Sequence, residues 1–409
     1  MKVTWKKLLL VVLAAGGAGT GSVLGAGFQL YNEGSAEALG LGGAISARRD
    51  LTSNAWYNPA SITDFKSPRL MLGATVAKLG SSYEGSGVDG DTDGKMETRW
   101  QAIPHIYYVH PLNHGTRATL FLSLTTPYGL ATDWDWKQNP YGPLYSNSMK
   151  LRSSYLTGGA AYAVTDNLSV AAGLSLVYAT VDYTSRLPGG PEMELQADAW
   201  GYAYSLAANY RFLEDWTVGI KYQSQVKLNL AGDATYTHSP VGSNSDNGVE
   251  ADLTLPATVT LGVATTAVPD WTFGFDVVWT DWSTYDELRV GFDQPPPGPY
   301  DPLLGVKNWR DVFSYRFGAE YRLKEAWKLR FGYVFDQSPA RAKYRSPELP
   351  DSDRHMFSTG IGYETERWGA DLSYCYLLLT NCDSQLGPLQ GSYKDGYAHL
   401  IAASVYYKF

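Results

Sequence analysis

The chain has 409 residues, a formal net charge of −8 and a slightly negative mean hydropathy of −0.24. Its acidic balance argues against a nucleic-acid partner, because no basic stripe is present to neutralise phosphates. After the first 30 residues no apolar run approaches the roughly 18 residues that a membrane-spanning helix needs, which excludes a helical membrane protein. Abundant tyrosine (30), tryptophan (13) and glycine (42) instead favour one large β-structure.

The N-terminus has the pattern of an export signal. Lys2, Lys6 and Lys7 precede the apolar run "LLLVVLAA" at 8–15, and small residues follow at Val23 and Gly25. We expect residues 1–25 to be a signal peptide and the mature chain to begin near Ala26, so the protein leaves the bacterial cytoplasm.

Residues 26–67 differ from the rest of the mature chain. They contain several glycines and the adjacent Arg48 and Arg49, and they show no sustained period of two or of 3.6 residues. An irregular polar segment that precedes a β-barrel fits inside its lumen as a hatch, whereas a periplasmic tail is the alternative. Periodicity alone does not choose between them.

From residue 69 onward the sequence alternates between apolar and polar positions in segments separated by turn signals. We predict fourteen strands. They are 69–83, 98–112, 116–132, 150–164, 168–187, 192–212, 216–235, 250–268, 271–290, 309–323, 327–345, 353–364, 368–380 and 396–409.

The connections between these strands alternate between short and long. Short turns such as "NHG" at 113–115 and "PD" at 269–270 take turns with longer loops rich in Gly, Pro, Asp and Ser, which is typical of outer-membrane barrels. Closing the sheet satisfies every backbone group in lipid. We therefore predict an all-β fold, a fourteen-stranded antiparallel transmembrane β-barrel over 68–409 with an N-terminal hatch in its lumen, located in the bacterial outer membrane.

Aromatic residues support the barrel. Four tryptophans each begin a predicted strand just after a short turn, where an interfacial girdle belongs; they are Trp216, Trp271, Trp327 and Trp368. The last strand carries an apolar row that ends at Phe409, through which we expect the barrel-assembly machinery to recognise the chain. We also expect contact with outer-membrane lipids, including lipopolysaccharide, and a monomeric state.

The third predicted strand is interrupted. Alternation over "TLFLSLTT" is followed by Pro127, Tyr128 and Gly129. Proline cannot donate to a ladder and glycine weakens one. Either the strand ends there, or it bends there for a functional reason.

Seven stretches, in order along the mature chain, resemble the FadL family of outer-membrane transporters for long-chain fatty acids and other hydrophobic compounds, which includes TodX-like hydrocarbon transporters. They are "AGFQL" (26–30), "NPASI" (58–62), "PYGLATDWD" (127–135), "LTLPATVTLGV" (253–263), "WTDWSTYDEL" (279–288), "RFGYVFDQSP" (330–339) and "ELPDSDRHMFSTGIGY" (348–363).

This resemblance implies a fourteen-stranded barrel with an N-terminal hatch, and it implies a mechanism. The cargo binds in an apolar luminal pocket and leaves sideways into the membrane through a gap at a kink in the third strand. The corresponding residues here are Pro127, Tyr128, Gly129, Leu130 and Ala131. A long apolar molecule has reason to avoid a wet pore, since each buried CH₂ is worth about 0.8 kcal/mol.

Further site residues follow from the same resemblance. Phe28 resembles a family phenylalanine that reaches toward the ligand pocket and gates it. Asn58, Pro59 and Ala60 match a motif that seats the hatch, although an Asn-Pro turn is common in any loop. Asp336 matches an acidic residue of the wall that contacts the hatch near the kink.

The sequence departs from fatty-acid members where these place basic residues near the ligand carboxylate. The aligned positions hold Thr180 and Gly305, with Lys307 nearby, which favours a ligand without a carboxylate, such as a hydrocarbon. Strand parity points Thr180 toward lipid. The polar loops at 186–193 and 236–250 are short, so capture of the cargo falls to the aromatic stretch 134–145.

Other chemistry has weaker support. Asp89, Asp91 and Asp93 copy half of a calcium loop, but the expected glutamate at its twelfth position is Trp100. Because no catalytic motif is visible, we expect neither an enzyme nor a cofactor. Cys375 and Cys382 are left open between a disulfide and two thiols. A surface adhesin or structural barrel is the second hypothesis, and a lipid hydrolase the third.

Overall fold

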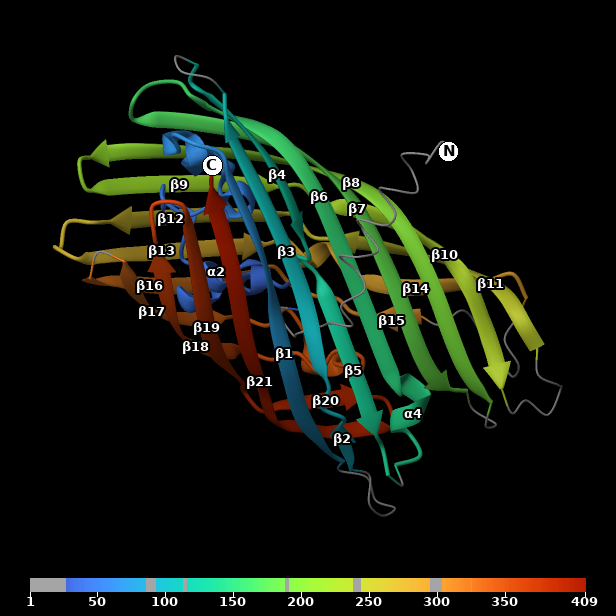
Figure 1. The fold of residues 1–409 in the computed structure, drawn as a ribbon. Helices are drawn as coiled ribbons and strands as arrows, with labels where there is room; N and C mark the ends of the chain where they lie inside the picture. Colours follow the sequence, from blue (N-terminus) through green and yellow to red (C-terminus); the bar gives the residue numbers. More distant parts are fainter. Residues whose placement is uncertain are drawn as a thin grey trace.

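The computed structural model describes residues 27–85, 93–112, 116–137, 139–187, 191–237, 244–294, 304–324 and 326–409. The expected signal peptide at 1–25 lies outside these ranges. A closed barrel of antiparallel strands surrounds a filled interior (Figure 1). None of the helices in the described ranges has the length and apolar character needed to cross a bilayer.

The barrel has fourteen strands, as the sequence predicted. The labels exceed fourteen for two reasons. Four barrel strands are interrupted and carry two labels each, which are β4/β5, β9/β10, β11/β12 and β13/β14. In addition, β2, β15 and β20 are short segments that are not barrel strands of their own. The strand segments are β1 (Arg69–Gly85), β2 (Gly94–Met96), β3 (Trp100–Pro111), β4 (Ala118–Thr125), β5 (Gly129–Asp135), β6 (Ser148–Ala163), β7 (Leu168–Arg186), β8 (Glu192–Leu213), β9 (Trp216–Gln223), β10 (Val226–Thr237), β11 (Asn244–Leu255), β12 (Thr258–Thr265), β13 (Trp271–Thr280), β14 (Glu287–Phe292), β15 (Leu304–Val306), β16 (Val312–Lys324), β17 (Trp327–Asp336), β18 (Arg354–Glu364), β19 (Trp368–Leu379), β20 (Cys382–Leu386) and β21 (Leu389–Lys408). The helical segments are η1 (Asn32–Gly34), α2 (Ala36–Gly40), α3 (Asn54–Tyr57), η2 (Pro59–Asp64), α4 (Gly142–Tyr145), η3 (Trp282–Thr284) and η4 (Ala342–Tyr344).

The first and last strands close the barrel. β1 pairs with β21 from Arg69↔Lys408 to Gly85↔Gly391. Along the wall, side chains alternate between the interior and the outer face, and large apolar residues project outward, as at Leu174 and Tyr202 with exposures of 74% and 77%. Such an outer surface is suited to lipid rather than water.

The predicted positions of the four tryptophans are confirmed. They begin β9, β13, β17 and β19, which all run in the same direction because alternate strands of an antiparallel barrel are parallel to one another. The outward row of the last strand is confirmed as well. Val405 and Phe409 on this row are 56% and 64% exposed.

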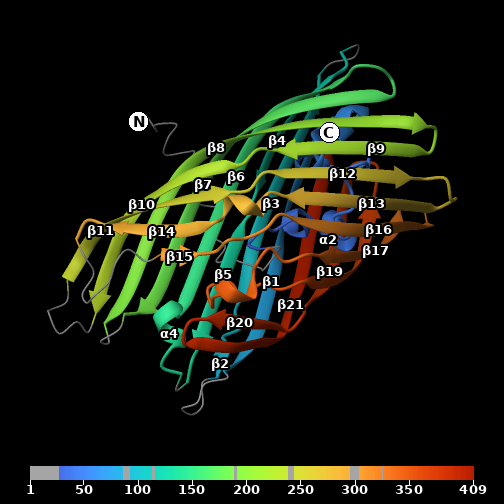
Figure 2. The ribbon, with the colours of Figure 1, turned by 180° about the vertical axis from the view of Figure 1, so that it is seen from behind.

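Residues 27–67, named here the hatch segment, lie inside the barrel, where the two opposite views show their short helices enclosed by strands (Figures 1 and 2). Their helices pack against the inner face of β17, β18, β19 and β21 on one side and of β6, β7 and β8 on the other. Glycines of the wall make this close approach possible. An added Cβ at Gly332 would lie 2.3 Å from the backbone nitrogen of Gly42.

Buried ion pairs hold the hatch segment to the wall. Glu320 on β16 accepts from Arg48 of the hatch segment at 2.8 Å and from Arg330 on β17 at 2.7 Å. Arg330 in turn reaches Asp371 on β19 at 2.5 Å. One carboxylate therefore joins a hatch cation to a wall cation, so that neither charge is buried alone.

Several predicted boundaries are wrong. The strands predicted as continuous over 216–235, 250–268 and 271–290 are interrupted, and the last strand, predicted from 396, begins at Leu389. The described residues of 236–250, expected as a loop, continue β10 and β11, which pair as far as Tyr236↔Asn244; residues 238–243 lie outside the described ranges. The predicted strand 327–345 ends at Asp336, and the chain then turns through η4 instead of continuing the wall. In the stretch 236–250 the polar residues hid two of its few apolar positions, Tyr236 and Val249, which are buried in a small cluster with neighbouring strands.

Candidate functional site

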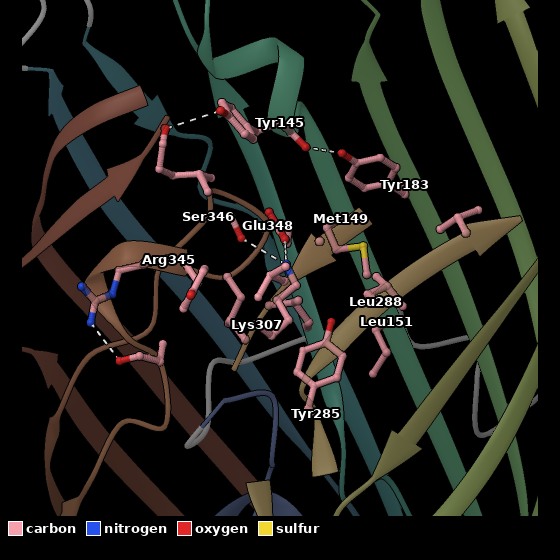
Figure 3. Close-up of a pocket in the computed structure, with 18 of the residues that line it drawn as sticks. Tyr145, Met149, Leu151, Tyr183, Tyr285, Leu288, Lys307, Arg345, Ser346 and Glu348 are labelled. Carbon is pink, nitrogen blue, oxygen red and sulfur yellow. Dashed lines mark hydrogen bonds and ion pairs between the residues drawn. The ribbon is translucent and has the colours of Figure 1, made fainter. Parts of the chain in front are cut away.

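An apolar pocket of about 710 Å³ lies in the barrel interior (Figure 3). Six neighbouring wall segments, β5 to β8, β10 and β11, each turn an aliphatic side chain into it, because strand alternation points every second residue inward. These side chains are Leu130, Leu151, Val181, Leu195, Leu230 and Leu253. The volume and lining suit a small hydrophobic molecule.

One buried ion pair lies on the pocket wall. Lys307, 5% exposed, bonds to the Glu348 carboxylate and donates to Ser346 Oγ at 3.2 Å (Figure 3). Burial raises the pKa of Glu348, but the charge and hydrogen bond of Lys307 outweigh this and hold that pKa below its usual value. Burial similarly lowers the pKa of Lys307, and the charge of Glu348 reverses this to a net increase. Both groups are thus charged at neutral pH and cancel each other.

An aromatic cluster around Phe28 of the hatch segment borders the pocket. The Phe28 ring, 3% exposed, lines the pocket and lies 4.7 Å from the Trp282 ring centre, 5.7 Å from that of Tyr285 and 5.9 Å from that of Trp309. The preceding Gly27 has φ +59°, and an added Cβ would lie 2.5 Å from the Trp309 ring. This position therefore requires glycine, and the turn that it allows aims Phe28 at the pocket.

The wall is interrupted beside this cluster. β4 ends at Thr125 and β5 begins at Gly129, while both remain paired with β6. The freed backbone groups pair with the hatch segment instead: Leu30 N donates to Pro127 O at 2.7 Å, and Gly129 N donates to Phe28 O at 2.9 Å. Gln29 and Tyr128 thus form a one-residue antiparallel bridge.

The other edge of the interrupted strand loses its neighbour. β3 pairs with β4 from Ile106↔Leu124 to Pro111↔Thr119, but within the described ranges no ladder pairing joins the first half of β3 to β5. β5 regains a partner only at β2, through Lys95↔Asp135 and Met96↔Trp134. The hydrogen-bonded wall is therefore open between β3 and β5 at the level of the break.

The remaining predicted residues of the hatch lie at its contacts with the wall. Asn58 Oδ1 accepts from Ala60 N at 3.1 Å, which caps η2, and Asn58 Nδ2 donates to Ala208 O of β8 at 3.1 Å. Pro59 begins η2, where its missing N–H costs nothing. Asp336 lies 3.9 Å from Arg354, whose guanidinium also donates to Gly27 O at 3.3 Å.

Other predictions have mixed outcomes. Thr180 lies on the opposite face of β7 from the pocket-lining Val181, as strand parity required, whereas Gly305 and Lys307 line the pocket. Of the aromatic stretch 134–145, Leu144 and Tyr145 line the pocket, whereas Trp134 stacks on Trp136 at 4.9 Å.

The metal and thiol hypotheses fare differently. Asp89 and Asp91 lie outside the described residues, and Asp93 lies within them. In the described ranges no group of three or more His, Cys, Asp or Glu side chains is placed to hold a metal ion. Cys375 and Cys382 are both free thiols.

Sequence reasoning missed the partners that complete the site. Trp282, Tyr285, Trp309 and Glu348 all lay in stretches treated only as strand or motif, and none of them was assigned to the site. The charge of Glu348 next to the apolar Leu349 was the available signal, but its partner Lys307 lies 41 residues earlier in the sequence.

A closed, lipid-facing barrel with an occupied lumen and an apolar internal pocket defines an outer-membrane transport barrel rather than an open porin. The chain belongs to the family described as "Outer membrane protein transport protein (OMPP1/FadL/TodX)", whose model matches residues 16–409. The protein is therefore an outer-membrane transport protein of this family.

Similar proteins agree with this assignment. The long-chain fatty acid transport protein of Escherichia coli O6:H1 is 27% identical over 388 residues, covering 83% of each chain. Among solved structures, a FadL homologue of Pseudomonas aeruginosa superposes with a TM-score of 0.81 at 19% identity, covering 94% of this chain and 100% of that one. The toluene transporter TodX of P. putida gives 0.72 at 17% identity, with 93% and 99% covered.

Proposed function

We propose that this barrel carries hydrophobic compounds, long-chain fatty acids or hydrocarbons, by binding them in the luminal pocket and releasing them sideways through the opening between β3 and β5. The names of the relatives, one for fatty acids and one for toluene, supply the two cargo classes. The neutralised Lys307–Glu348 pair lets the pocket accept cargo without a charge. Contact with lipopolysaccharide, recognition of Phe409 by the assembly machinery and a monomeric state stay predictions.

One observation carries the proposal. The residues that close the pocket are also the residues that complete the broken strand: Phe28 forms the pocket boundary, while its own carbonyl and Leu30 N satisfy the backbone of 127–129. Movement of this short segment would open the pocket and the wall together. The roles of Phe28 as gate, of 127–131 as exit, and of Asn58, Pro59, Ala60 and Asp336 in seating the hatch all rest on this coupling.

A disulfide across the bridge tests the proposal. Gln29 and Tyr128 are opposite each other but share no hydrogen bond; the bonds from Leu30 N to Pro127 O and from Gly129 N to Phe28 O lie on either side of them. The Cα atoms of such a pair are about 4.5 Å apart. A disulfide can span this distance. In a Cys375→Ser, Cys382→Ser background, we expect oxidised Q29C/Y128C to lose uptake of radiolabelled oleate and of toluene, and the reductant to restore it.

The single variants Q29C and Y128C control for the loss of either side chain. Equal uptake by the oxidised and reduced double variant would show that the segment need not move, and would refute lateral release through this opening.

A further inference from the structure

A buried lysine near the strand break is not explained by the site described above. Lys221 points inward from β9 and is 6% exposed. Its ammonium donates to Trp56 O at 2.5 Å and lies 3.9 Å from the centre of the Trp56 ring. None of the described carboxylates forms an ion pair with it. Lys307, Arg48 and Arg330, by contrast, each have a carboxylate partner.

Such a lysine is costly to bury. An ammonium group has three donors, and a cation without a counter-ion in a low-dielectric interior is strongly destabilising. Ionisable groups at membrane depth commonly belong to the pathway of a substrate. The cation–π contact with Trp56 compensates only in part, which leaves the ammonium with free capacity for an anion.

Lys221 borders a small cavity of about 20 Å³ that is separate from the main pocket. This cavity has room for about one water-sized group. Gln29, Leu30 and Tyr31 of the hatch segment form one side, and Pro127 and Tyr128 of the strand break form another. Its polar lining includes Gln223, whose Oε1 is buried without a hydrogen-bond partner, and the threonines of β12, which are Thr258 and Thr260.

The position of this cavity gives Lys221 a place on the exit route. Phe28 faces the main pocket, whereas the next three residues of the same segment face the small cavity. The hatch segment is thus the partition between the two spaces. A displacement of residues 28–31 would remove this partition between the main pocket and the Lys221 cavity.

We propose that Lys221 is an anion subsite for the carboxylate of an amphipathic cargo as it passes from the main pocket to the strand break. The aromatic rings of Trp56, Tyr128 and Tyr155 around it provide apolar walls for the attached chain. In the main pocket Lys307 is neutralised by Glu348, while Lys343 and Arg345 lie among the other lining residues. Lys221 is a separate cation beside the strand break, where an acid gains an interaction that a hydrocarbon does not. This inference rests on the proposed exit through the break.

The test compares two cargoes of matched length, radiolabelled laurate and dodecane, in cells that depend on this protein for uptake. We expect K221M to lower laurate uptake about tenfold, the size of one lost charge-assisted hydrogen bond, with dodecane uptake unchanged. K221R keeps the charge and is expected to retain laurate uptake. K227M, which removes an exposed lysine from β10, serves as the matched control for both cargoes.

The outcomes separate the inference from the proposed function. A wild-type barrel that carries neither cargo refutes the proposed function and this inference with it. If the wild type carries laurate and K221M carries it equally well, transport stands and the subsite is wrong. An equal loss of both cargoes in K221M assigns Lys221 a structural role and also overturns the subsite. If K221M fails to reach the membrane as a folded barrel, K221Q is compared with K221R in its place, under the same criteria.

Discussion

Lys307 shows how an ion pair changes the character of a lysine that lines an apolar pocket. An inward lysine would by itself attract an anion, but Glu348 occupies its ammonium, so the two charges of this pair cancel. A carboxylate cargo must then compete with an internal carboxylate, whereas an uncharged cargo loses nothing. The sequence departures at Thr180 and Gly305 led to the same expectation, although the pairing of Lys307 with Glu348 was not foreseen.

Substitution of Glu348 should change this preference. In E348Q the Lys307 ammonium is no longer neutralised, so we expect the affinity for laurate to rise about tenfold and that for toluene to stay within about twofold of the wild type. Isothermal titration of the barrel in nanodiscs measures both. E287Q, at an exposed carboxylate on β14, is the control. Unchanged laurate affinity in E348Q would mean that Glu348 does not screen the pocket.

The same pair sets a pH expectation. Because the pKa of Glu348 is lowered in the folded protein, its contribution to stability is present above the unfolded value of about 4.3 and is lost as the pH falls through the lowered folded value. Glu348 therefore stays charged, and the pair with Lys307 intact, from about pH 5 to 8. We expect the affinity of the wild type for toluene to be constant over this range.

At the scale of elements, the strand map shows what periodicity can and cannot predict. All fourteen strands were placed from alternation and turn signals, because a lipid-facing side and a luminal side impose that pattern on every residue pair. The break at Pro127 was visible because proline and glycine are local signals. Its connection to Phe28 and Leu30 was not, since a backbone pairing between segments about 100 residues apart leaves no local trace.

Restoring the third strand should impair release. In P127V/G129V the first substitution restores a backbone N–H donor, and both place a β-branched side chain in the break. These changes favour continuous pairing of this strand with β3. We expect uptake of oleate and of toluene to fall about tenfold or more, which corresponds to roughly 1.4 kcal/mol or more in the release step. Uptake is measured in cells with equal amounts of folded barrel.

G158V on the neighbouring β6 is the matched control, because an added Cβ there meets no atom closer than 3.7 Å. Wild-type uptake by P127V/G129V would show that the break is a structural accident and not an exit.

For the whole molecule, apolar packing, hydrogen bonds and buried charges join the hatch segment to the barrel. Glu320 is one buried link between them, since it accepts from Arg48 of the hatch segment and from Arg330 of the wall. In E320Q two guanidinium groups lose their shared carboxylate, while Arg48 keeps Asp50 and Arg330 keeps Asp371, so the cost is that of a lost charged hydrogen bond, about 1.5–3 kcal/mol. We expect hydrogen exchange in the hatch segment to rise about tenfold or more, with exchange in the barrel strands unchanged.

E364Q is the control for this experiment. Glu364 accepts from Lys328 and Lys408, which both belong to the wall, so its loss leaves the hatch contacts intact. Equal exchange in E320Q and wild type would locate the main attachment of the hatch elsewhere.

The seam between β1 and β21 has a consequence for how the molecule is assembled. It joins the two strands that are farthest apart in the chain, so it is the last ladder that can form and its loop-closure entropy is the largest. The hatch segment directly precedes β1 and ends up enclosed behind this seam. Because the hatch segment and the closing strand β1 are neighbours in the chain, we expect docking of the hatch and closure of the ring to be coupled steps in the biogenesis of the barrel.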